Sequence, residues 1–164
     1  MLRRAVLLIT MLLVALTAGR AFWAWLGENP THISGSAYVE FFQALDHSIE
    51  LPIAITGIGS VFFVAFSAVL ERRDRVVMCL LLSALALVLV ANVVTVTINV
   101  PINHQIARFD PAALPVDWPT LRDRWWHAHL IRTAALLPAL VLVFGAVLMR
   151  DPHRQVSRDP NSLR

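Results

Sequence analysis

The segment VVMCLLLSALALVLVANVVTVTINV, residues 76–100, indicates the fold of this chain. It contains no charged residue, and a helix needs about 20 residues, at about 1.5 Å each, to cross the hydrocarbon core of a membrane. A run of this length and composition predicts a transmembrane helix. Three other stretches are similarly long and apolar: residues 5–26, 51–70 and 130–149. The sequence therefore predicts an all-α integral membrane protein, a bundle of four transmembrane helices.

The overall composition is that of a membrane domain. The chain has 164 residues, 57% of them hydrophobic and 15% charged, and its mean hydropathy is +0.65. Ordinary soluble domains are less apolar, and this length suits one domain. We assign residues 1–150 to a single four-helix transmembrane domain and residues 151–164 to a polar cytoplasmic tail.

The arginines predict the orientation. The chain has no lysine, and its arginines gather in short segments beside the apolar runs, so the net charge of +3 reflects membrane topology and not nucleic-acid binding. Such segments stay on the cytoplasmic side, which predicts a protein of the cell membrane with both termini in the cytoplasm. The arginines concerned are Arg3, Arg4, Arg72, Arg73, Arg75, Arg150, Arg154, Arg158 and Arg164.

Residues 1–21 also resemble a secretory signal, with a basic head and an apolar stretch, so cleavage of the first span stays an alternative. The chain's single cysteine, Cys79, cannot support a dithiol relay. This disfavours the quinone-linked disulfide enzymes that also use four helices.

Two outer loops have helical patterns. In the first, AYVEFFQALDHSIE (residues 37–50) has an apolar face and predicts an extra amphipathic helix, capped by Ser34 or Ser36, that lies at the surface or stands on the second span. Pro52 then marks an elbow or a new first turn. In the second loop a helix is expected from about Pro119. Its polar stripe, at steps of three, four and three, consists of Arg122, Trp125, His129 and Arg132.

With this topology, all four helices carry polar groups at the outer end. Asn92, Thr95, Asn99 and Asn103 share one side of the third helix, and Pro101 predicts a kink with a freed carbonyl about one turn earlier. Amides often hydrogen-bond across membrane helices, which is our interpretation of Asn92. Ionisable residues inside a bundle more often line a pocket or pathway, which is our interpretation of the outer cluster. The five tryptophans also suit an interfacial aromatic belt.

A metal site is a minor alternative. His47, Glu50, His104 and His129 lie at the same end, and imidazole with carboxylate suits zinc, iron or copper. Their spacing does not demand a metal, so no metal, haem or other cofactor is predicted.

Several motifs resemble one family. They are NVPIN at residues 99–103, the dipeptide Asp117–Trp118, and R-x-x-W-x-x-x-H-x-x-R from Arg122 to Arg132, with YVEFFQAL (residues 38–45) similar in style. Over roughly residues 35–148 the chain resembles the anthrone oxygenase-like membrane proteins, once a domain of unknown function. The resemblance implies a small four-helix membrane protein. Fungal members are associated with oxidising anthrones to anthraquinones, without an obvious flavin, haem or metal motif.

This resemblance suggests an enzyme that acts on a lipophilic aromatic molecule. An anthrone has an acidic carbon, so a base and donors to the enolate oxygen would allow direct reaction with oxygen. We assign the base to His129 or His47, and the oxyanion donors to Asn99, Asn103 and Arg132. Further substrate contacts are assigned to Trp125, His47, Glu50, His104 and Arg122.

Two other functions remain open. The protein could be a non-catalytic lipid- or quinone-binding protein, or an accessory subunit of a membrane complex. A drug or ion transporter is less favoured, because no acidic residue lies deep in a span. The expected partners are membrane lipid and a lipophilic small molecule, while a homo-oligomer or a complex with another membrane protein stays open.

Overall fold

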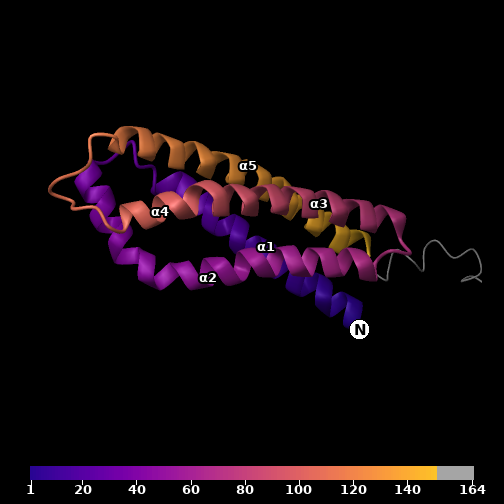
Figure 1. The fold of residues 1–164 in the computed structure, drawn as a ribbon. Helices are drawn as coiled ribbons and strands as arrows, with labels where there is room; N and C mark the ends of the chain where they lie inside the picture. Colours follow the sequence, from indigo (N-terminus) through magenta and orange to yellow (C-terminus); the bar gives the residue numbers. More distant parts are fainter. Residues whose placement is uncertain (151–164) are drawn as a thin grey trace, which may run out of the picture.

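The structure is a computed structural model that describes residues 1–150, with the side chains of residues 46–50 excepted (Figure 1). The predicted tail, residues 151–164, lies outside the described residues. The described chain consists of helices joined by short turns and loops. They are α1 (Leu2–Gly27), α2 (Gly35–Leu70), α3 (Arg75–Val94), the π-helical turn η1 (Thr95–Asn99), α4 (Val100–Ile106) and α5 (Trp118–Met149).

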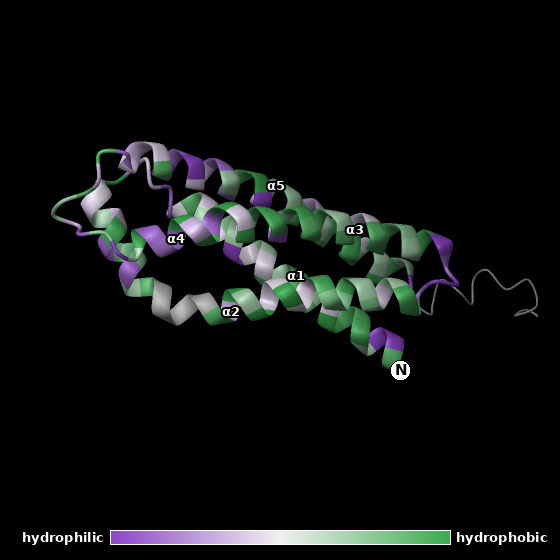
Figure 2. Cartoon of the chain, viewed as in Figure 1, coloured by the Kyte–Doolittle hydropathy of each residue, from purple (hydrophilic) through white to green (hydrophobic). Residues whose placement is uncertain are grey.

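Four helical stretches are long and apolar enough to cross a membrane: Leu2–Gly27, Leu51–Leu70, Arg75–Ile106 and Trp118–Met149. This confirms the predicted four-helix membrane fold, and the protein is a multi-pass membrane protein. Figure 2 shows hydrophobic ribbon along the length of the bundle and hydrophilic ribbon gathered towards its two ends. The polar residues are therefore concentrated where the chain meets water.

The outer part of α2 continues directly into the second span. The helix runs unbroken from Gly35 to Leu70, with Pro52 inside it, where we had predicted an elbow or a new helix. Proline removes only one N–H from the helical ladder, and membrane helices tolerate this loss when the freed groups find other partners. Ser34 caps the start of α2, because its hydroxyl accepts a hydrogen bond from the backbone N–H of Ala37 at 3.3 Å.

The third span widens before its proline. Val100 donates its backbone N–H to the carbonyl of Thr95, five residues earlier, and this defines the π-helical turn η1. Pro101 has no N–H to donate, so the kink predicted at the proline takes the form of a wider turn on its N-terminal side. Such π turns inside α-helices occur frequently at functional sites.

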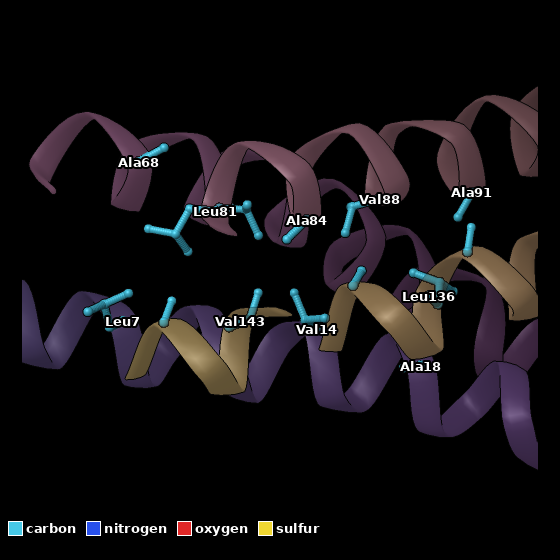
Figure 3. Packing of buried hydrophobic residues seen from close by; sticks show 14 of the residues in the cluster. Leu7, Val14, Ala18, Ala68, Leu81, Ala84, Val88, Ala91, Leu136 and Val143 are labelled. Atoms are coloured by element: carbon cyan, nitrogen blue, oxygen red, sulfur yellow. The ribbon is translucent and has the colours of Figure 1, made fainter. Parts of the chain in front are cut away.

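The half of the bundle that ends at the turn between α2 and α3 is closely packed. We call it the inner half, and the half that contains η1 and α4 the outer half, after the predicted orientation. α5 and α2 each contact α1 and α3, so α2 and α5 occupy diagonal positions. Small and β-branched side chains fill the centre, among them Val14, Ala18, Ala84, Val88 and Val143 (Figure 3). Small residues let helix backbones approach each other closely, which is how helices gain van der Waals contact in a membrane.

Candidate functional site

A cavity of about 350 Å³ lies in the outer half of the bundle, between α1, α2, the third span and α5. Its volume is at the lower end of the range for small-molecule sites, about 300 to 1,000 Å³. Most of its surface is apolar, although half of the lining residues carry a polar group. The polar lining residues are Thr17, Arg20, Glu28, Tyr38, Thr56, Asn92, Thr95, Asn99, Asn103, His104, Trp125 and Arg132.

The third span contributes one polar wall. Asn92, Thr95, Asn99 and Asn103 all line the cavity, as expected from their shared side of the helix. Asn92 does not act as predicted, because its amide donates to the carbonyl of Val88 on its own helix at 2.9 Å and not to another helix among those described. Its carbonyl oxygen instead limits how closely α2 can approach.

The two other asparagines are tied to α5 through one tryptophan. Asn99 donates its amide N–H to the backbone carbonyl of Trp125 at 3.2 Å, and the indole N–H of Trp125 donates to the side-chain oxygen of Asn103 at 2.7 Å. Asn99 is 1% exposed, and its side-chain oxygen has no hydrogen-bond partner among the described residues. The π turn η1 ends at Asn99, so the widened helix carries this acceptor.

His129 lies behind the cavity wall and is fully buried; it does not itself line the cavity. The geometry requires Nε2–H to donate to the carbonyl of Ala21 at 3.1 Å, because Nδ1 accepts from Nε of Arg132 at 3.1 Å. The ring is therefore a neutral tautomer with both nitrogens occupied. It also stacks on Trp125 and Trp126, with centroid distances of 5.3 and 5.4 Å.

Arg132 lines the cavity and is held by that histidine. Within the part of the chain whose side chains are described, no carboxylate lies within ion-pair distance of its guanidinium. Arg20, the other cavity arginine, differs because it pairs with Glu28 at 2.9 Å. The cavity thus contains one neutralised arginine and one that has no such counter-charge among the described side chains.

Several polar cavity residues, among them Thr17, Thr56, Glu28 and Tyr38, were not predicted as site residues by the sequence analysis. Glu28 follows the first span by one residue, and Tyr38 lies in the segment predicted as an amphipathic helix. Tyr38 is 3% exposed and packs against the rings of Trp118 and Trp125. Burial, and to a lesser extent the charge of Glu28, raises the pKa of the Tyr38 hydroxyl, so this group stays protonated at physiological pH.

The remaining predicted residues fall in different places. His104 lines the cavity, whereas Arg122 pairs with its neighbour Asp123 at 2.8 Å and does not line it. The side chains of His47 and Glu50 lie outside the described part of the structure.

Among the described side chains, no group of three or more His, Cys, Asp or Glu residues could hold a metal ion. Two of the four residues considered for a metal, His47 and Glu50, are not covered by that statement. The metal alternative therefore remains a sequence-based interpretation.

The comparisons with known proteins agree with the motifs. No curated protein and no solved structure matches the chain. The family sequence model described as anthrone oxygenase matches residues 41–142. This range runs from the second turn of α2 to most of α5, and it includes the polar wall of the third span and the cavity residues Trp125 and Arg132 of α5. This match spans more than half of the chain, and the protein therefore belongs to the anthrone oxygenase family.

Proposed function

We propose that this membrane protein is an oxygenase that binds a lipophilic aromatic ketone of the anthrone class in the outer cavity and oxidises it with molecular oxygen. The observation that carries the proposal is Arg132, a cavity guanidinium without an ion-pair partner among the described side chains. A cation in a largely apolar cavity favours a ligand on which negative charge develops, as it does on the oxygen of an enolate.

The reaction needs no more than a base, oxyanion donors and oxygen. The base takes a proton from the ring carbon opposite the carbonyl, and the negative charge spreads onto the carbonyl oxygen beside Arg132. The carbanion transfers its electrons to O₂ and forms a C–O bond. The resulting peroxide anion takes up the proton to become a hydroperoxide, which loses water to form the second carbonyl, so one O₂ is consumed and one H₂O released per quinone.

The proposed roles follow from the contacts. Arg132 holds the enolate oxygen, Asn103 and Asn99 form the adjoining polar wall, and the Trp125 ring offers a flat surface for stacking. His129 positions Arg132 and does not act as the base, because Nδ1 already accepts from that arginine. Glu28 and His104, which both line the cavity, are the described candidates for the base; His47 stays a sequence-based candidate.

The test uses purified protein in lipid vesicles, with unsubstituted anthrone as substrate and oxygen uptake and quinone absorbance as readouts. Loss of an oxyanion donor typically lowers turnover by about 10² to 10³, which is the effect expected of Arg132→Met. The matched control is Arg122→Met on the same helix, since Arg122 lies outside the cavity lining.

The outcomes separate the functions considered. If the unmodified protein takes up no more oxygen than empty vesicles, it is not this oxygenase. Anthrone binding without oxygen uptake would then favour the non-catalytic lipid- or quinone-binding protein. Equal turnover of the Arg132→Met and Arg122→Met proteins would remove Arg132 from the mechanism.

We also propose that the protein lies in the cell membrane with both termini in the cytoplasm, which would place the cavity near the outer surface. The arginine-rich turn between α2 and α3 supports this orientation. Cysteines introduced in that turn and in the loop before α5 should react with an impermeant reagent in intact cells only at the latter. The opposite pattern would reverse the orientation.

A further inference from the structure

The cavity is not sealed, and part of its rim lies at membrane depth. Two lining residues are also among the most exposed apolar side chains of the bundle, Ile58 at 69% and Val96 at 64%. Ile58 belongs to the span Leu51–Leu70, and Val96 to the span Arg75–Ile106. Where a side chain faces both the cavity and the lipid, the wall between the two is a single side chain thick.

The backbone explains why the wall thins there. At Gly57, α2 approaches the third span closely, since a Cβ on that residue would lie 3.1 Å from the side-chain oxygen of Asn92. Beyond this point the third span widens into η1, and Figure 1 shows α2 bowed away from the third span before it returns to the end of α4, where Gln43 donates to the carbonyl of Ile106 at 3.3 Å. The close contact at Gly57 forms the floor of the opening and the π turn forms one side.

The exposed residues at this part of the lining are apolar. Within residues 51–70 and 75–100, the cavity-lining residues that are exposed are Ala54, Ile58 and Val96, whereas the polar ones are at least partly buried. The charged lining residues Arg20, Glu28 and Arg132 are all half-buried. An uncharged molecule can pass an apolar rim from the lipid, whereas a charged one would lose its hydration without compensation.

We propose that the ligand is an uncharged, ring-bearing molecule dissolved in the bilayer, and that it reaches the cavity sideways between α2 and η1, past Ile58 and Val96. The identity of the ligand rests on the proposed function, but the route does not. The lateral opening towards the lipid thus selects for uncharged ligands. The ligand loses its proton only after it has bound beside Arg132.

The route is tested without any substrate. Thr95 lines the cavity, and its hydroxyl bonds only to the carbonyl of Ala91 on its own helix, so Thr95→Cys is a mild reporter in a Cys79→Ser background. In vesicles, an uncharged lipid-soluble maleimide should label this protein, and a charged impermeant maleimide should not. Labelling by the charged reagent at an equal rate would show an aqueous route, and no labelling by either reagent would show a sealed cavity; both results overturn the proposal.

The opening itself is tested by filling it. Ile58→Phe together with Val96→Phe should slow labelling by the uncharged reagent about tenfold, because access through a narrowed opening becomes limiting. The matched control is Ile55→Phe together with Val93→Phe, which are 59% and 58% exposed in the same helical turns but do not line the cavity. Equal labelling rates in the two double variants would overturn the proposed position of the opening.

A second arm separates this inference from the proposed function. In vesicles preloaded with anthrone, the Ile58→Phe and Val96→Phe pair should lower the oxidation rate relative to the control pair. If the labelling results hold but the unmodified protein does not oxidise anthrone, the lateral route stands and the oxygenase proposal fails. If anthrone is oxidised at the same rate in both double variants, the substrate uses another route.

Discussion

The inner and outer halves of the bundle differ in how their buried polar groups are hydrogen-bonded. In the inner half the buried hydroxyls of Thr10 and Ser67 are 2.8 Å apart and satisfy each other, within a core of small aliphatic residues. In the outer half, the oxygen of Asn99 and one guanidinium nitrogen of Arg20 have no described partner, and a cavity remains beside them. At the inner end, Glu71 and Arg150 form an ion pair. Because unmet polar groups are costly in a membrane, we propose that the outer half is the part of the molecule that binds a ligand.

Among the variants that compare the two halves, the largest expected effect concerns His129, which bonds to Ala21 on α1 and to Arg132 on its own helix. An asparagine there places its amide oxygen near the position of Nδ1 and can still accept from Arg132, while a glutamine places its amide nitrogen near Nε2 and keeps only the bond to Ala21. Losing a hydrogen bond to a charged group costs about 1.5 to 3 kcal/mol. His129→Gln should therefore lower anthrone turnover about 10- to 100-fold, and His129→Asn should lower it less.

Thermal unfolding in detergent serves as the control for these two variants, because a purely structural histidine would change stability and turnover together. If His129→Asn reduces turnover as much as His129→Gln, the contact with Arg132 is not the function of this residue. His129 would then contribute to stability only, as the buried residues of the inner half do.

The next effect comes from placing the same larger side chain in each half. Ala84 is fully buried in the inner core, and overpacking a core typically costs about 1 to 3 kcal/mol, so Ala84→Leu should lower the unfolding temperature clearly. Ala91 is also buried, at 2% exposure, but lines the cavity. Ala91→Leu should cost less stability, because the added atoms extend into free space, and should weaken ligand binding. Equal losses of stability would contradict the contrast between a packed and an open half.

A smaller effect is expected from the hydrogen bond of the inner half. Thr10→Val and Ser67→Ala each remove the bond between these hydroxyls. Such bonds contribute about 0.6 and at most about 1.7 kcal/mol in membrane bundles. The double variant should lose less free energy of unfolding than the sum of the losses in the two single variants. Turnover of anthrone should stay unchanged in all three. Strict additivity would mean that the two hydroxyls act independently.

The smallest effect is expected at Gly57, at the boundary between the halves. A methyl group there would lie 3.1 Å from the side-chain oxygen of Asn92, so that amide must shift by a few tenths of an ångström. Gly57→Ala should change ligand affinity slightly, with little change in unfolding. The control is Gly59→Ala on the same helix, whose nearest neighbour, Leu13, is at 3.4 Å. Identical behaviour of the two variants would show that Asn92 adjusts freely.

The fold was largely predictable because a membrane constrains length. The four spans, the loop positions and the helical start near Pro119 follow from run length and turn residues. The continuity of α2 through Pro52 did not follow, since the same sequence allows an elbow or a continuous helix. Packing against α1 and α3 accompanies the continuous form.

The depth of the site residues in the membrane was predictable from the sequence, whereas the direction in which each side chain points was less so. Asn99, Asn103, His104, Trp125 and Arg132 line the cavity, and all were selected because the topology places them at one level. His129 shares that level but points its ring at α1, because it is pinned between the carbonyl of Ala21 and Arg132. Glu28 joins the site through Arg20, eight residues away, a contact that no local pattern indicates.

The sequence alone therefore determined that this is a four-helix membrane protein of the anthrone oxygenase family, with its candidate site residues at one end of the bundle. Depth in a membrane is a one-dimensional property, set by about 1.5 Å of rise per helical residue and by where charged residues stop the apolar runs. Only the tertiary structure decided which polar groups satisfy each other, which arginine has no carboxylate beside it among the described side chains, and where a cavity remains. Those depend on the rotation and spacing of neighbouring helices, which arise from contacts between residues far apart in the chain.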